Sequence, residues 1–171
     1  YLSFFILLFI GELSVSAQHM FSRQFPFFNQ LSSNEIFSIH QDREGYFWIG
    51  TTNGLARYDG YQLNTFRTDY KNQNLLTDNG INAINDNDLY VWIGTWKGLN
   101  LYNKQTCRIT PFSDARLLDK VVDAITVDKD GNVWVSAGGM IYRCDSTAHI
   151  IKEYEVGNIQ EGYAISNIYV D

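Results

Sequence analysis

The sequence predicts an all-β fold, an incomplete β-propeller of about three and a half four-stranded antiparallel blades. Aromatic residues make up 15% of the 171 residues, with Tyr and Phe at eleven each and Trp at four, and aromatic side chains favour the half-buried faces of β-sheets. The chain also repeats itself, because tryptophans recur at positions 48, 92 and 134, spaced by 44 and 42 residues. A period of this length, with four short strands in each unit, is typical of propeller blades.

The composition excludes several other classes of protein. The formal net charge is −6, so the chain offers no general electrostatic attraction for nucleic acid. Apolar residues make up 45% and charged residues 19%, which argues against disorder and against a Lys/Glu-rich coiled coil. Cys107 and Cys144 lie 37 residues apart without metal-ligand spacing, and two cysteines are too few for a disulfide scaffold. We expect a packed globular chain without cofactor, metal or nucleic-acid partner.

Residues 1–17 are typical of a secretory signal peptide that is truncated at its start. Residues 2–10 are apolar apart from Ser3, and polarity then rises towards the small residues 15–17, which form a cleavage site. A membrane-spanning helix needs about 20 apolar residues, roughly twice this run. The chain begins with Tyr1 and has no basic leader, which predicts that its start is missing. We expect export with cleavage after Ala17; the alternative is a buried core segment.

Residues 18–35 are expected to hold an N-terminal strand and a lead-in, and residues 36–75 the first blade. The segment 21–25 (FSRQF) would suit an outer strand that completes the missing last blade. Within the first blade, β-favouring runs predict strands at 36–41, 46–51, 55–58 and 63–66. The stretch from Asp42 to Gly45 predicts the first turn, because Asp caps turns and Gly adopts positive φ.

Two further full repeats follow in register. The second blade, residues 76–117, contains INAINDNDLYVWIGTWKGLNLYN, and the third, residues 118–160, contains VDAITVDKDGNVWVSAGGMIYRCD. They superimpose on the first repeat with one deletion. Residues 161–171 are expected to start a fourth blade, whose innermost strand begins at Ile165. A parallel β-helix is the alternative solenoid, but its repeats are shorter.

The repeated residues have predicted structural roles. The wedges between adjacent blades should be filled by Trp48, Trp92 and Trp134, and small residues two positions on, Gly50, Gly94 and Ser136, should leave room for the indole rings. Acidic residues recur near the end of each innermost strand, at Asp42, Asp86, Asp128 and Asp171. Because they occur once per repeat, turn capping explains them better than a catalytic pair.

The repeat resembles that of the two-component regulator propeller family. The first copy matches the pattern almost throughout, at Ile36, Ile39, Asp42, Gly45, the run Trp48 to Thr51, Gly54, Leu55 and the run Arg57 to Asp59. The second copy lacks the turn glycine and has Leu101 in place of the arginine, and the third has Ser136 and Ala137 in place of Gly-Thr. The resemblance covers residues 36–171.

This resemblance implies a receptor function. Propellers of this family form the periplasmic sensing part of inner-membrane receptors, typically hybrid sensor histidine kinases of Bacteroides-like bacteria, which respond to glycan-derived oligosaccharides. The expected partners are a small carbohydrate, the remaining blades and the downstream domains of the same receptor, and a homodimer is compatible with them. The membrane would be reached only through the parent protein, and the kinase would lie outside this segment.

No catalytic residues are expected in this segment. The three histidines, at positions 19, 40 and 149, are scattered, and the sequence has no Gly-x-Ser-x-Gly elbow, phosphate-binding glycine loop or Cys/His pairing. The alternative functions are a protein-interaction scaffold and, less favoured, a propeller glycoside hydrolase or lyase.

Ligand-binding candidates come from one predicted face of the disc. The turns between second and third strands and the connections between blades emerge on the same face, which predicts a binding surface of Asn53, Trp96, Lys97, Tyr70, Arg116 and Tyr163. Trp96 is not the repeated tryptophan, since its counterparts are Thr52 and Gly138. An exposed indole suits stacking on a sugar ring; the alternative is that Trp96 packs on a neighbouring loop.

Overall fold

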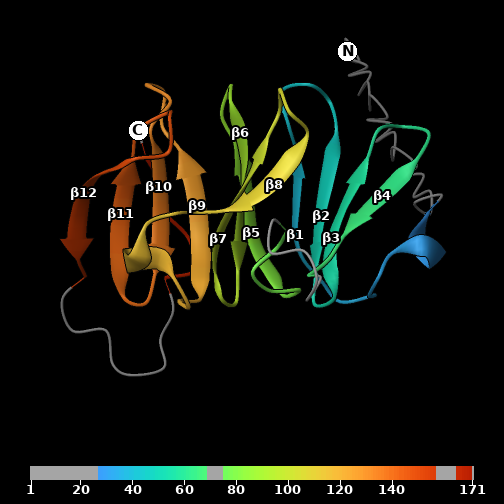
Figure 1. Ribbon diagram of the computed structural model, residues 1–171, viewed down its shortest axis with the longest axis horizontal. Coiled ribbons are helices and arrows are strands. Elements are labelled where there is room, and N and C mark those ends of the chain that lie inside the picture. Colours follow the sequence, from blue (N-terminus) through green and yellow to red (C-terminus); the bar gives the residue numbers. More distant parts are fainter. Residues whose placement is uncertain (1–26, 69–74, 157–164, 171) are drawn as a thin grey trace, which may run out of the picture.

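The computed structural model describes residues 27–68, 75–156 and 165–170, and it confirms the all-β propeller architecture in three four-stranded antiparallel sheets. Figure 1 shows the sheets standing side by side. The predicted signal peptide, the segment 21–25, Tyr70, Tyr163 and Asp171 lie outside the described residues. Within the described ranges, no helix is both long enough and apolar enough to cross a membrane.

Each sheet is a meander whose strands are neighbours in sequence. The first contains β1 (Ile36–Gln41), β2 (Phe47–Thr51), β3 (Gly54–Tyr58) and β4 (Leu63–Phe66). The second contains β5 (Ile81–Asp86), β6 (Tyr90–Thr95), β7 (Gly98–Asn103) and β8 (Arg108–Pro111). The third contains β9 (Val122–Val127), β10 (Val133–Ala137), β11 (Met140–Cys144) and β12 (Ile150–Glu155). Two single 3-10 turns, η1 (Phe28–Gln30) and η2 (Ala115–Leu117), lie outside the sheets.

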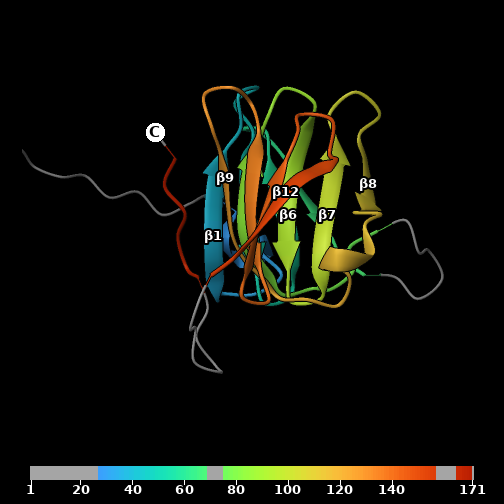
Figure 2. The ribbon, with the colours of Figure 1, turned by 90° about the vertical axis from the view of Figure 1, so that its left-hand side faces the viewer.

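The innermost strand β5 adjoins both β1 and β9, and Figure 2 shows β1 and β9 on the side of the molecule opposite β8. The turns between second and third strands meet the connections between blades, as predicted, because Gly54 N–H donates to the Asn79 carbonyl and Gly98 N–H to the Lys120 carbonyl. Residues 165–170 lie on the same side as β1 and β9 in Figure 2 but form no strand. An innermost strand pairs with the second strand of its own blade, and the described residues offer this segment no such partner.

The hydrophobic core lies in two seams between neighbouring sheets. Trp48 packs with Ile81, Val91 and Ile93 of the second sheet. The indole of Trp92 likewise packs in a cluster with residues of the third sheet, among them Val122, Val133 and Val135. Trp48 and Trp92 have no exposed surface, whereas Trp134, in the last of the three sheets, is only partly buried. Burial of a large ring at each seam stabilises the stacking of blades by a few kcal/mol.

The glycines two residues after the tryptophans leave space for the next blade, whereas the sequence predicted that they leave space for the indole rings. A Cβ atom on Gly50 would lie 2.7 Å from Cγ2 of Ile81, and one on Gly94 would lie 2.6 Å from Cγ1 of Val122. Ile81 and Val122 are each the first residue of the innermost strand of the following sheet. The space left by each glycine is therefore occupied by the neighbouring blade and not by the indole of the same blade.

Asp86 does not hold the turn position that the sequence alignment predicted. It lies within β5 and pairs with Val91, whereas Asp42 follows the last residue of β1. Asn87 takes the capping role, because its Oδ1 accepts from the backbone N–H groups of Leu89 and Tyr90. The turn between the first and second strands is one residue shorter in the second sheet, since Asp86 pairs with Val91 whereas Gln41 pairs with Phe47. Asp86 therefore remains in the strand.

Candidate functional site

A cavity of about 250 Å³ lies where the innermost strands converge. Four segments line it, one from each repeat: Phe37, Ser38, Asn82, Ala83, Ile84, Asp123, Ala124, Ile125, Thr126, Ser166, Asn167 and Ile168. The residues of the wall include apolar ones together with residues that carry hydroxyl, amide and carboxyl groups.

Equivalent positions of the repeats meet in this cavity. Phe37, Asn82 and Asp123 are each the second residue of an innermost strand, and Ser166 holds the same place after Ile165. The residue before each of them is always Ile or Val. Two of these residues, Ile81 and Val122, pack against the preceding blade. The lining position itself changes in size, polarity and charge from one repeat to the next. That variation within an otherwise regular repeat is the sequence signal that could have identified the site.

Asp123 is the charged residue of the lining. Its side chain is partly buried, and burial raises the pKa of its carboxyl above the ordinary value. Among the residues that the structure describes, no hydrogen-bond donor pairs with this carboxylate, and no Lys, Arg or His lines the cavity. A ligand that offers a hydroxyl or an ammonium group would supply the missing partner.

Trp96 borders the cavity through two of its lining residues. Its indole Nε1–H donates to Oδ1 of Asn82 at 2.8 Å, and its ring meets that of Phe37 edge-on at 6.3 Å between centroids. The ring also lies over Gly80, where a Cβ atom would come within 2.3 Å of it. Trp96 is 42% exposed. The indole therefore packs on a neighbouring loop and still presents surface beside the cavity.

Asn53, Lys97 and Arg116, the other predicted ligand-binding residues that the structure describes, do not line the cavity. Asn53 donates from Nδ2 to the Ser32 carbonyl at 3.2 Å. Lys97 is exposed in the same turn as Trp96. Arg116 is bound to carboxylates, at 2.7 Å from Asp114 and 3.6 Å from Glu153. Tyr70 and Tyr163 lie outside the described residues.

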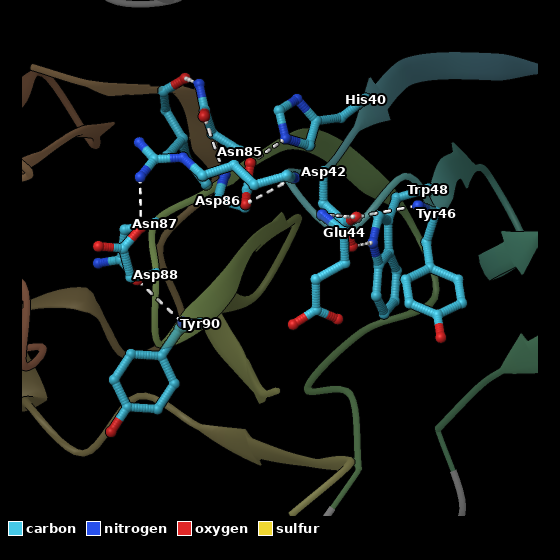
Figure 3. Close-up of polar contacts among 12 residues, drawn as sticks. His40, Asp42, Glu44, Tyr46, Trp48, Asn85, Asp86, Asn87, Asp88 and Tyr90 are labelled. Atoms are coloured by element: carbon cyan, nitrogen blue, oxygen red, sulfur yellow. Dashed lines mark hydrogen bonds and ion pairs between the residues drawn. The ribbon is translucent and has the colours of Figure 1, made fainter. Parts of the chain in front are cut away.

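A second polar cluster orients the repeated tryptophans, as Figure 3 shows for Asp42 and Trp48. Oδ1 of Asp42 accepts from the backbone N–H groups of Glu44 and Tyr46, and Oδ2 accepts from Trp48 Nε1 at 2.6 Å. Asp128 accepts in the same way from its own turn and, at 3.1 Å, from Trp134. The sequence predicted the turn caps but not the indole contacts.

Asp86 joins the first two blades through buried ionic contacts. Its Oδ1 lies 2.7 Å from Nε2 of His40, and its Oδ2 lies 2.6 Å from Nζ of Lys104. Figure 3 shows His40 reaching from β1 towards Asp86. Burial by itself would raise the pKa of Asp86, but the contacts with His40 and Lys104 outweigh it and lower the pKa to about 2. This cluster links the first blade to the second, and the sequence did not predict it.

The described residues contain no grouping of three His, Cys, Asp or Glu side chains that could hold a metal ion. The site so far defined is a polar and aromatic cavity suited to binding an organic molecule through hydrogen bonds and ring contacts.

Fold and repeats together define the class of this protein, a β-propeller assembled from tandem antiparallel blades. Residues 30–53 match the two component regulator propeller family, which confirms the resemblance stated from the repeat residues. A search of the curated proteins gave no match.

Solved structures similar to this chain include two extracellular domains. The first is the extracellular domain of BT3049 of B. thetaiotaomicron, described as a hybrid two component system, with 27% identity over 73% of this chain and a TM-score of 0.63. The second is the extracellular domain of BT4673 of B. thetaiotaomicron, described as a one component system, with 22% identity over 83% of this chain and a TM-score of 0.62. The second likeness supports the fold alone. The chain spans about a fifth of either structure, 19% and 20% of their lengths.

Proposed function

We propose that this chain is part of a periplasmic sensor propeller of a two component receptor and that its cavity binds a carbohydrate derived from a glycan. The observation that carries the proposal is the cavity itself, which is lined by one segment from each of four repeats. A ligand bound there contacts several blades at once. Its binding free energy would therefore favour one arrangement of the blades, which is what a sensor requires.

The chemistry of the wall suits a sugar. Thr126, Ser166 and Asn167 supply amide and hydroxyl groups that can both donate and accept hydrogen bonds. Phe37, with Trp96 beside it, offers ring surface for the C–H face of a saccharide. A volume of about 250 Å³ is close to the lower end of small-molecule sites, which suits one or two sugar residues.

The assignment to a receptor is supported by the similar structures. The more similar of the two is an extracellular domain of a protein described as a hybrid two component system. Export of this chain, predicted from residues 1–17, agrees with that location. The remaining blades, the membrane anchor, the signalling domains and a homodimer belong to the proposal, because this chain spans 19% of that structure.

Thermal and urea unfolding of the protein that carries this chain, with and without saccharides, tests the proposal. We expect a saccharide at 100 times its Kd to raise the free energy of unfolding by about 2.7 kcal/mol. Trp96→Ala should weaken that effect, and Tyr61→Ala should not, because Tyr61 is 85% exposed in the turn between β3 and β4.

Two outcomes would contradict the proposal. Capture of a protein partner with no stabilisation by any saccharide would favour an interaction scaffold. Release of shortened sugars from an oligosaccharide would favour a hydrolase or lyase.

A further inference from the structure

We infer that the second position of each innermost strand determines ligand specificity, and that Asp123 makes the cavity select neutral or positively charged saccharides over acidic ones. The inference rests on the proposed function and names the class of sugar that the site accepts.

The repeat geometry brings the specificity positions together. In every repeat the preceding residue, Ile36, Ile81, Val122 or Ile165, is a branched apolar residue. Such residues are restricted by packing, since Ile81 and Val122 occupy the space above Gly50 and Gly94. The next residue, Phe37, Asn82 or Asp123, is left out of the pairing with the second strand, where the register shifts at a β-bulge. This residue lines the cavity, where it can vary without disturbing the seam.

Asp123 dominates the electrostatics of this wall. The positions equivalent to it hold Phe37, Asn82 and Ser166, none of which carries charge. Two basic residues precede β9 in the chain, and both have other partners. Lys120 donates to the Tyr142 hydroxyl at 3.0 Å, and Arg116 forms an ion pair with Asp114. Within the described part of the chain, nothing in the lining offsets the charge of Asp123.

A partly buried carboxylate without a donor favours ligands that bring one. A sugar hydroxyl or the ammonium of an amino sugar would hydrogen-bond to Asp123, and a charge-assisted bond is stronger than a neutral one. A uronate or sulfate would instead place a second negative charge in the same small cavity. At the effective dielectric constant of a protein surface, this repulsion weakens binding by roughly tenfold or more.

The test is an array of saccharides probed with the full protein at low salt. The array holds neutral xylo-, arabino-, galacto- and manno-oligosaccharides, cationic chitosan oligomers, acidic oligogalacturonates and heparin oligosaccharides. Wild-type protein, Asp123→Asn and Asp130→Asn are compared. Asp130 is exposed in the turn after β9, so its variant has the same change of charge away from the cavity.

We expect the wild-type protein and Asp130→Asn to bind neutral or cationic sugars and to reject the acidic ones. Asp123→Asn should gain binding of acidic sugars by about tenfold and lose any preference for chitosan oligomers. Equal binding of acidic sugars by wild-type protein, or an unchanged profile in Asp123→Asn, would overturn the inference and leave the proposed function standing. Binding of no saccharide at all would overturn both.

Discussion

Asp42 uses its two carboxylate oxygens for two different purposes. Oδ1 accepts from two backbone N–H groups and closes the turn between β1 and β2, and Oδ2 accepts from the indole of Trp48. The turn and the largest side chain of the seam are thereby fixed to one another. In the second blade this link is missing, because Asp86 stays in β5 and Nε1 of the buried Trp92 has no hydrogen-bond partner.

The contrast between Trp48 and Trp92 predicts unequal costs for the same substitution. Trp48→Phe removes a buried hydrogen bond and leaves Oδ2 of Asp42 without its partner. Trp92→Phe removes a donor that has no partner. Both variants lose similar ring volume, so Trp48→Phe should lower the free energy of unfolding by about 1–3 kcal/mol more than Trp92→Phe. Urea unfolding of the two variants measures the difference, and equal costs would contradict it.

Single residues were predictable where the interaction is local. The caps by Asp42 and Asp128 span two to four residues, a distance over which sequence patterns are informative. The pairing of Asp86 with His40 spans 46 residues and two blades, so no local pattern could show it.

The element that recurs most faithfully is the hairpin of second and third strands. The hydroxyl of Thr51 donates to the Gly54 carbonyl at 2.9 Å, and that of Thr95 donates to the Gly98 carbonyl at 2.8 Å. These bonds explain why Thr ends the second strand in two repeats. The third repeat has Ala137 there and is followed by Gly138 and Gly139, both with positive φ. Ala137 has no hydroxyl group to form the hydrogen bond that Thr51 and Thr95 form. Glycine adopts the positive φ angles that this turn requires without strain.

Packing of one element against the next predicts coupling between Gly50 and Ile81. Gly50→Ala would bring a Cβ atom to 2.7 Å from Ile81 Cγ2 and should cost about 1–3 kcal/mol of stability. Ile81→Ala removes that methyl group and costs about 2–5 kcal/mol by itself. The double variant should be more stable than the sum of the two costs indicates, because the contact with Cγ2 is removed and only the milder contacts with Cβ at 3.0 Å and the carbonyl oxygen at 3.1 Å remain.

Urea unfolding of the two single variants and the double variant completes the cycle. Ser136→Ala is the matched control at the equivalent position of the third blade, where the buried hydroxyl has no partner, and it should not destabilise the protein. Additive costs for Gly50→Ala and Ile81→Ala would show that the two residues do not meet.

At the scale of the whole molecule, blades are joined by apolar seams and by the ionic cluster around Asp86. Asp86 and Lys104 belong to the second blade, while His40 belongs to the first. All three side chains are mostly buried, with exposed fractions of 4%, 6% and 21%. Loss of charge on Asp86 would leave Lys104 buried without its partner, which is unfavourable.

This cluster predicts a pH dependence of stability. The pKa of Asp86 falls from 3.8 to about 2 on folding, so the folded state holds this proton less tightly than the unfolded chain. The stabilisation is fully present above about pH 4 and is lost as the pH falls through about 2. It amounts to about 2 kcal/mol. Urea unfolding of wild-type protein and Asp86→Asn between pH 6 and pH 2 should show the stability gap narrowing across that interval.

The control for this pH dependence is Asp88→Asn. Asp88 is 84% exposed and pairs with Arg43 at the surface, so its loss should leave the acid-induced decline of the wild-type protein unchanged. A gap between wild-type protein and Asp86→Asn that stays constant down to pH 2 would contradict the assignment.

The amino-acid sequence alone determined the fold class, the repeat period and the order of strands in each blade. These follow from local pairing and from a pattern that returns every 42 to 44 residues. The residues of each repeat are therefore enough to predict its own strands and turns. Only the tertiary structure decided where Asp86 lies, which residue fills the space above Gly50, and that Phe37, Asn82, Asp123 and Ser166 share a cavity. Those contacts join residues of different blades, and their distances depend on how the blades stack and twist, which no single repeat encodes.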